Sequence, residues 1–221
     1  MLVYLYNFRV LDLERIPYMS GVIRNIYAFV NLALAAFVLA AIAVRFVFPA
    51  VSVEGPAFWV IRTSPVSMRA FLWSKFWTGL VPVLVMTETL TVLSNEYLGA
   101  SPFLKALAAT AVLFMTFALV GLAAGMGAQH PRFNAENVTQ VAGSYGGVAF
   151  MVLAVLFTIV TIALLAWPSS IYLYHLHRGS PISTLRKVQM AASFGSAAGL
   201  SVACFLVSMA RGVRALNRMG G

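Results

Sequence analysis

Residues able to carry out acid–base or metal chemistry are few in this chain, and they lie far apart in its sequence. The 221 residues include six acids and three histidines: Asp12, Glu14, Glu54, Glu88, Glu96, Glu136, His130, His175 and His177. Catalysis needs several such groups around one substrate. The sequence also lacks a glycine-rich loop ending in Gly-Lys-Ser or Gly-Lys-Thr, which holds nucleotide phosphates. We therefore predict no catalytic, cofactor or metal site on this chain.

Two positions still leave alternatives open. Glu88 lies in the middle of an apolar run, where a carboxylate is costly unless it is protonated, paired or in contact with water. It is either part of an ion pathway or coupling step, or a protonated or threonine-bonded group inside a helix bundle. His175 and His177 could both contact a metal, but no carboxylate or cysteine joins them. An interfacial, aromatic-like role is therefore favoured for the two histidines.

Composition places these residues in a membrane protein. The chain is 61% hydrophobic and 10% charged, with a mean hydropathy of +0.89, which leaves too little polar surface for a soluble globule. Its apolar runs are about twenty residues long, which suits spanning helices rather than the shorter strands of a barrel. The net charge of +9 would suggest nucleic acid in a soluble protein. Here the basic residues lie between apolar runs and fit lipid headgroups, so no nucleic-acid partner is expected.

We predict a single transmembrane domain over residues 1–221, an all-α polytopic helix bundle with five spans. The expected spans are 26–47, 78–98, 104–127, 148–167 and 189–209. Pro82 predicts a kink in the second span, and Pro168 the end of the fourth. Residues 99–103 predict a tight reversal.

Small residues four apart predict close helix contacts, within one chain or between two. They are Gly121 and Gly125 in the third span, and Gly195 and Gly199 in the fifth.

Residues 49–77 form the most polar stretch between two spans. Tryptophans alternate there with Arg and Lys, a pattern typical of a helix lying among lipid headgroups. Ser64 and Pro65 predict a helix start, because serine can cap free amide groups and proline is tolerated at the first helical position. Glu54 is either a headgroup-level ion pair or helix-start carboxylate, or a contact point for a partner.

Contacts with a partner or with headgroups are expected from two segments on one side of the membrane. The candidates are Glu54, Trp59, Arg62, Arg69 and Lys75, with Arg132 and Glu136 from the loop after the third span. Lys and Arg are almost equally numerous on the two sides, so charge alone does not orient the chain. Met1–Tyr6 looks like the end of a spanning helix, so we expect the chain to begin inside a longer membrane protein.

Several motifs together resemble the membrane subunits of ABC transporters of the type-2 exporter superfamily, and among them the bacterial ABC exporter permeases. The first group of motifs comprises Arg45-Phe46-Val47-Phe48-Pro49, Ser52-Val53-Glu54-Gly55, Phe58-Trp59, Ser64-Pro65-Val66-Ser67 and Lys75-Phe76. The second comprises Gly125-Met126-Gly127-Ala128, Pro131-Arg132-Phe133-Asn134-Ala135-Glu136-Asn137 and Gly143-Ser144-Tyr145-Gly146-Gly147. Gln129-His130 departs from the family pattern, which has Ala-Phe or Leu-Phe there. The resemblance thins out after Trp167.

The resemblance implies a permease that exports an unknown substrate across the bacterial inner membrane together with a separate ABC ATPase subunit, which would bind the ATP. It also implies that residues 49–77 face the cytoplasm and include the region that docks on the ATPase. Membrane lipids and a second permease copy, in a homo- or heterodimer, are further expected partners. Two alternatives remain: a lipid-modifying membrane enzyme using Glu54 or Glu88, and an ion-coupled secondary transporter using Glu88.

Overall fold

A computed structural model describes residues 20–135, 137–178 and 183–219, which are helical and contain no strand. Five helices are long and apolar enough to cross a membrane: α2 (Ser20–Phe46), α4 (Met68–Tyr97), α5 (Pro102–Gln129), α7 (Tyr145–Arg178) and α8 (Thr184–Arg218). The short elements are η2 (Phe48–Ala50), η3 (Ser52–Ala57), α3 (Phe58–Thr63) and α6 (Val138–Ala142). The predicted all-α bundle with five spans is confirmed. The prediction for Met1–Tyr6 lies outside the described residues.

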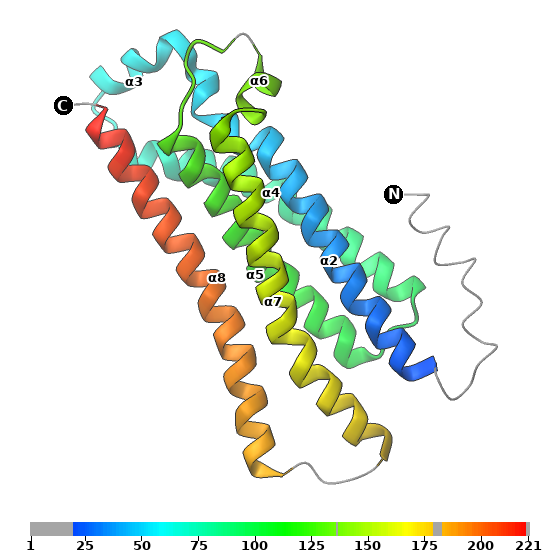
Figure 1. Cartoon of the computed structure of the whole chain (residues 1–221). Helices are drawn as coiled ribbons and strands as arrows, with labels where there is room; N and C mark the ends of the chain where they lie inside the picture. The colour runs from blue at the N-terminus through cyan, green and yellow to red at the C-terminus, as the bar shows by residue number, and fades with distance from the viewer. Residues whose placement is uncertain (1–19, 136, 179–182, 220–221) are drawn as a thin grey trace.

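The long helices alternate in direction, so the connections gather at two ends of the bundle (Figure 1). One end holds η2, η3 and α3 between α2 and α4, residues 130–144 with α6 between α5 and α7, and the C-terminal end of α8. We call this end the polar end. The opposite end holds the short turn between α4 and α5. There Gly99 has φ +60°, and Ser101 caps α5 by accepting a hydrogen bond from the Leu104 N–H, so the predicted reversal is confirmed.

Helix α5 is the centre of the bundle. It is buried without interruption from Ala118 to Ala128, because α2, α4, α7 and α8 all pack around it. Within this run, Gly121 lies against Phe205 of α8, and a Cβ on Gly125 would lie 2.3 Å from the carbonyl oxygen of Ser208. These glycines therefore pack within one chain, as small residues four apart permit.

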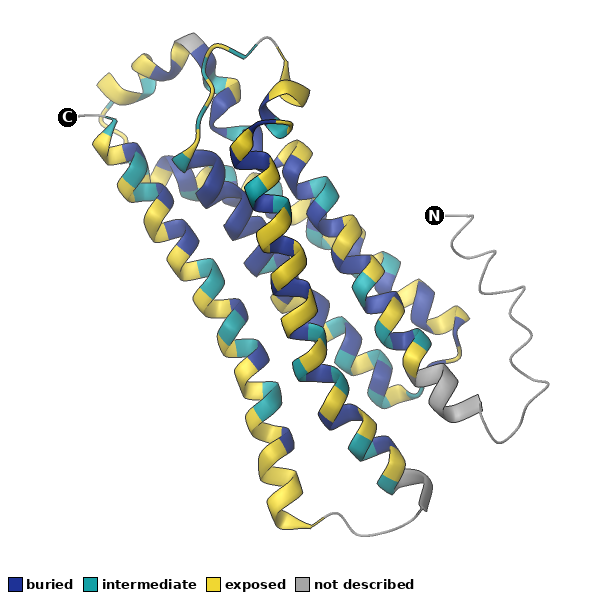
Figure 2. Ribbon diagram, in the orientation of Figure 1, coloured by how far each residue is buried: buried dark blue, intermediate teal, exposed yellow. Residues whose placement is uncertain are grey.

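The corresponding pair in α8 makes no such contact. A Cβ on Gly195 or Gly199 would meet no described atom within 4 Å. Val85 of α4, Ile159 of α7 and Leu206 of α8 are among the exposed apolar residues. Figure 2 shows exposed positions recurring along α7 and α8. In a membrane these positions would contact lipid hydrocarbon.

The helix start predicted at Ser64 and Pro65 is wrong. Ser64 instead ends α3, its hydroxyl donating to the carbonyl of Ile61, and it is extended with ψ 156°, as residues before proline prefer. The next helix begins three residues later, where the Ser67 hydroxyl accepts a hydrogen bond from the Ala70 N–H. That helix is α4, so the last part of the segment 49–77 is the first part of a spanning helix.

The helix end predicted at Pro168 is also wrong, since α7 continues to Arg178. Beyond the proline, Leu173 is buried against the first turn of α5, and the ring centroid of Tyr172 lies 4.3 Å from that of Phe103. This packing stabilises the extra turns. Spanning helices tolerate an internal proline where neighbouring groups compensate for the lost hydrogen bond.

Candidate functional site

The polar end begins where η3 turns sharply at Gly55. Its φ of 48° and ψ of −133° are readily adopted only by glycine. A Cβ at this position would lie 3.6 Å from the carbonyl oxygen of Phe133, in the loop after α5. The turn places Glu54 on one side and α3 on the other, so these two parts of the predicted partner-binding segment have different surroundings.

Glu54 forms a salt bridge with Lys75, which links η3 to α4. Both side chains are 27% exposed, so the pair is shielded from solvent on most sides. The Lys75 ammonium also lies 5.5 Å from the ring centroid of Phe71, within cation–π range. The sequence left Glu54 either as an ion pair or helix-start carboxylate, or as a contact point for a partner. The salt bridge directly supports the ion pair.

Aromatic stacking joins the two polar segments that sequence places on one side. Phe58, 5% exposed, stacks on Phe133 at 4.7 Å between centroids and lies 6.0 Å from Phe71 of α4. The backbone N–H of Arg132 donates to the Ser52 hydroxyl at 3.0 Å. These contacts fix η3, α3, the loop after α5 and the start of α4 as one packed unit.

The other predicted partner residues project from this unit. Trp59 is 66% exposed, and Arg62, Arg69 and Arg132 are exposed as well. The prediction for Glu136 lies outside the described residues. The predicted set thus divides into a paired Glu54 and Lys75 inside the unit, and an outward group of one tryptophan and three arginines.

Sequence reasoning left three arginines of the polar end out of the site. Arg211, Arg214 and Arg218 lie on the last turns of α8, and all are exposed. Their spacing of three and four residues puts them on one helix face, which was the signal available in the sequence. None of these arginines, nor any of the outward group, makes a salt bridge with a described residue. The polar end therefore presents a basic surface that suits acidic protein surfaces or anionic headgroups.

Glu88 lies apart from this surface, in the membrane-spanning part of α4. Thirteen residues separate it from Lys75, which is about 20 Å along a helix. One Glu88 carboxylate oxygen is buried without a hydrogen-bond partner among the described residues. The same holds for one oxygen each of Thr91, Ser94 and Asn95 further along α4. Glu54 and Glu88 are thus not brought together, so the two cannot act as the pair of acids that one form of the lipid-modifying enzyme would use.

His175 lies at the opposite end of the bundle, where α7 meets α8. Its Nε2 atom is 2.6 Å from the Arg186 guanidinium, so this ring nitrogen already has a partner. Among the described residues, no three His, Cys, Asp or Glu side chains are grouped as metal ligands.

Comparison with known families fits this division between membrane helices and a polar end. A family model described as "Putative ATP-binding cassette" matches residues 1–220, nearly the whole chain. The chain belongs to this family. No curated protein and no solved structure matches it significantly. Together with its five helices long and apolar enough to cross a membrane, this family membership makes the chain an ABC transporter-associated membrane protein.

Proposed function

We propose that this chain is the membrane permease subunit of an ATP-driven exporter and works with a separate ABC ATPase subunit. Family membership supports the association with ABC transporters. The observation that carries the proposal is the packed unit at the polar end, which contacts α4 through the Glu54–Lys75 salt bridge and the Phe58–Phe71 rings and presents exposed Trp59 and arginines. Such a unit can receive a push from a soluble partner and pass it to a spanning helix.

The proposed mechanism is alternating access. ATP binding would close the partner ATPase against α3, and the Phe58 and Glu54 contacts would transmit that movement to α4. The ATPase can shift the permease only if its two states contact the polar end differently. Exposed residues are well suited to this role, because they can gain and lose contacts without unfolding the bundle. The polar end would then face the cytoplasm of a bacterial cell, with the spans in the inner membrane.

The proposal is tested by co-purification after charge reversal at the polar end. The double variant Arg62→Glu and Arg69→Glu should lose a P-loop ATPase that the unchanged chain recovers from native membranes in mild detergent. It should also lose the associated ATP hydrolysis. Both arginines are exposed, so the fold should persist. Lys187→Glu, an exposed basic residue at the opposite end, is the matched control and should retain the ATPase.

Two results would contradict the proposal. One is a folded, unchanged chain that recovers no ATPase in several mild detergents. The other is equal recovery with the double variant and the control, because the polar end would then not be the docking surface. Binding of the unchanged chain to anionic vesicles, lost in the double variant, would assign the arginines to headgroups instead.

One observation favours a second function, the ion-coupled secondary transporter. It is the buried, unpartnered oxygen of Glu88 among three further unpartnered oxygens on α4. Transport that is independent of any ATPase and abolished by Glu88→Gln would establish that function in place of the exporter.

A further inference from the structure

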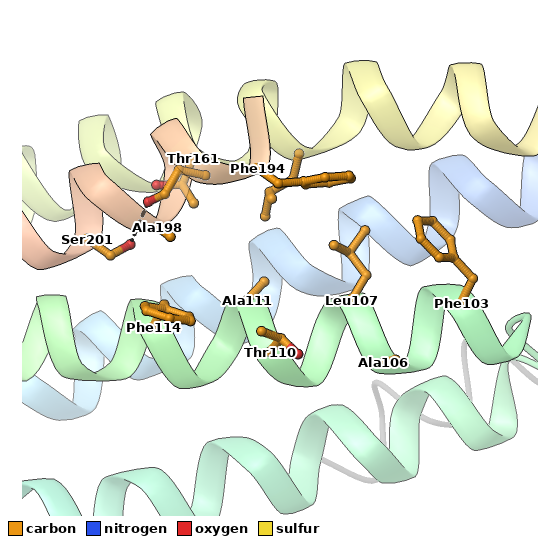
Figure 3. Close-up of a pocket in the computed structure, with 12 residues that line it drawn as sticks. Phe103, Ala106, Leu107, Thr110, Ala111, Phe114, Thr161, Phe194, Ala198 and Ser201 are labelled. Atoms are coloured by element: carbon orange, nitrogen blue, oxygen red, sulfur yellow. Dashed lines mark hydrogen bonds between the residues drawn. The ribbon is translucent and has the colours of Figure 1, made fainter. Parts of the chain in front are cut away.

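A cavity of about 350 Å³ lies between α5, α7 and α8, in the half of the bundle remote from the polar end (Figure 3). Phe103 and Phe114 of α5 and Phe194 of α8 form its aromatic walls. Thr110, Thr161 and Ser201 are the hydroxyl residues of the lining, and none of the described lining residues is charged. Pockets of this size and composition are typical of sites for small, mostly apolar ligands.

The cavity spans about the thickness of one lipid leaflet. From Phe103 to Phe114 the rise along α5 is about 17 Å, and half of the bilayer hydrocarbon is about 15 Å. A second cavity of about 250 Å³ continues along the seam between α5 and α8 and shares Phe114 and Ser201 with the first. Both cavities are lined mainly by apolar side chains, which suits the chain of a lipid-like molecule.

Thr161 is a lining residue whose buried hydroxyl lacks a partner in the described part of the chain. Its side chain is 2% exposed, and its hydroxyl oxygen has no hydrogen-bond partner among the described residues. Buried hydroxyls elsewhere on α7 donate to the carbonyl four residues earlier, as Thr158 does to Ala154 at 2.8 Å and Ser169 to Leu165 at 2.6 Å. An unsatisfied buried hydroxyl is costly, and a ligand oxygen would remove that cost.

We propose that this cavity binds an uncharged lipid-like molecule, with its chain between the phenylalanines and an ester or ketone oxygen accepting a hydrogen bond from Thr161. The absence of charged lining residues disfavours ionic and peptide ligands, which would lose hydration without compensation. The assignment of this ligand as the exported cargo rests on the proposed exporter function. Binding itself does not.

The test uses the purified full chain in phosphatidylcholine nanodiscs, without any ATPase. Two photoactivatable probes carry the same diazirine-labelled acyl chains: a diacylglycerol, which is uncharged, and a phosphatidylcholine, whose headgroup must stay at the interface. We expect the diacylglycerol to label cavity peptides of α5, α7 and α8 at least about fivefold more than the phosphatidylcholine. Mass spectrometry of the labelled peptides provides the readout.

Two matched pairs of variants locate the site. Ala198→Trp fills the cavity and should abolish the labelling, whereas Ala203→Trp, on the exposed face of α8, should preserve it. Thr161→Val should lower the labelling about fivefold, equivalent to one net hydrogen bond, whereas Thr158→Val should not. Ala106→Trp, which also fills the cavity, replaces Ala198→Trp if that variant does not fold.

Labelling that is equal for both probes, or unchanged by the filling variants, would overturn the inference because it would report ordinary surrounding lipid. The outcome is separable from that of the exporter proposal. A chain that recruits an ATPase but is not labelled refutes only the ligand site, and a labelled chain that recruits none refutes only the exporter.

Discussion

The contact between α5 and α8 can be tested by adding one methyl group to either of two glycines. In Gly125→Ala the new Cβ would lie 2.3 Å from the Ser208 carbonyl oxygen, which belongs to the backbone and cannot rotate away. Ordinary contact begins at 3.4 Å, so the two helices must separate by roughly 1 Å in an interior that is otherwise close-packed. In Gly195→Ala the same methyl group meets no described atom within 4 Å.

The two substitutions should therefore have different effects on the free energy of unfolding. Overpacking typically costs about 1–3 kcal/mol, and alanine recovers about 0.5–1 kcal/mol over glycine inside a helix. We expect Gly125→Ala to lose about 1–2 kcal/mol, which lowers Tm by roughly 2–8 °C for a chain of this size. Gly195→Ala should be neutral or slightly stabilising.

Thermal unfolding in one detergent, followed by circular dichroism, compares both variants with the unchanged chain. Equal Tm values for the two variants would refute the close approach of α5 and α8. A loss confined to Gly195→Ala would instead place the tight helix contact at the other end of α8, between two chains.

Three further predictions concern α3 and α4. Phe58→Ala should lower the free energy of unfolding by about 3–5 kcal/mol, because its ring is buried between two others. Trp59→Ala, which truncates its exposed neighbour, should leave the free energy of unfolding unchanged but weaken ATPase recovery. Equal losses of stability in the two variants would contradict the packing. A double-mutant cycle of Glu54→Gln and Lys75→Met should give a coupling energy of up to about 1 kcal/mol, and no coupling would mean that the pair does not form in solution. Glu88→Gln should leave the ATP hydrolysis of the reconstituted permease and ATPase unchanged, whereas a loss there would assign Glu88 a coupling role.

Local sequence signals were sufficient for the number of spans and for the reversal at Gly99, because long apolar runs and a glycine turn depend on a few adjacent residues. They failed at Ser64, which can either begin or end a helix, and at Pro168, where a helix can either stop or continue. Ser67 is an equally good cap, and packing of Leu173 holds α7 together beyond its proline. Tertiary contacts decided both cases.

The candidate site was predictable in its residue types but not in its pairings. The sequence does not distinguish a basic residue that is exposed from one that is ion-paired. The salt bridge between Glu54 and Lys75 could therefore be recognised only from the three-dimensional structure. The cavity was beyond prediction for a different reason. Its walls come from residues about 90 positions apart, and their Phe, Ala and Thr side chains are the types that any lipid-facing helix carries.

In the proposed exporter, a movement of α4 must reach the cavity through α5, α7 or α8, because these three helices line the cavity and no residue of α4 does. One link is a point near the polar end where α4, α5 and α8 meet. A Cβ on Gly212 of α8 would lie 2.9 Å from the Gly125 Cα of α5 and 3.0 Å from a methyl carbon of Leu72 in α4. At such a contact, α4 cannot tilt toward α8 without displacing it. Because α5 and α8 line the cavity further along, a small shift at Gly212 would change its width, so a bulkier side chain at Gly212 should alter ligand labelling although the cavity lies several turns away.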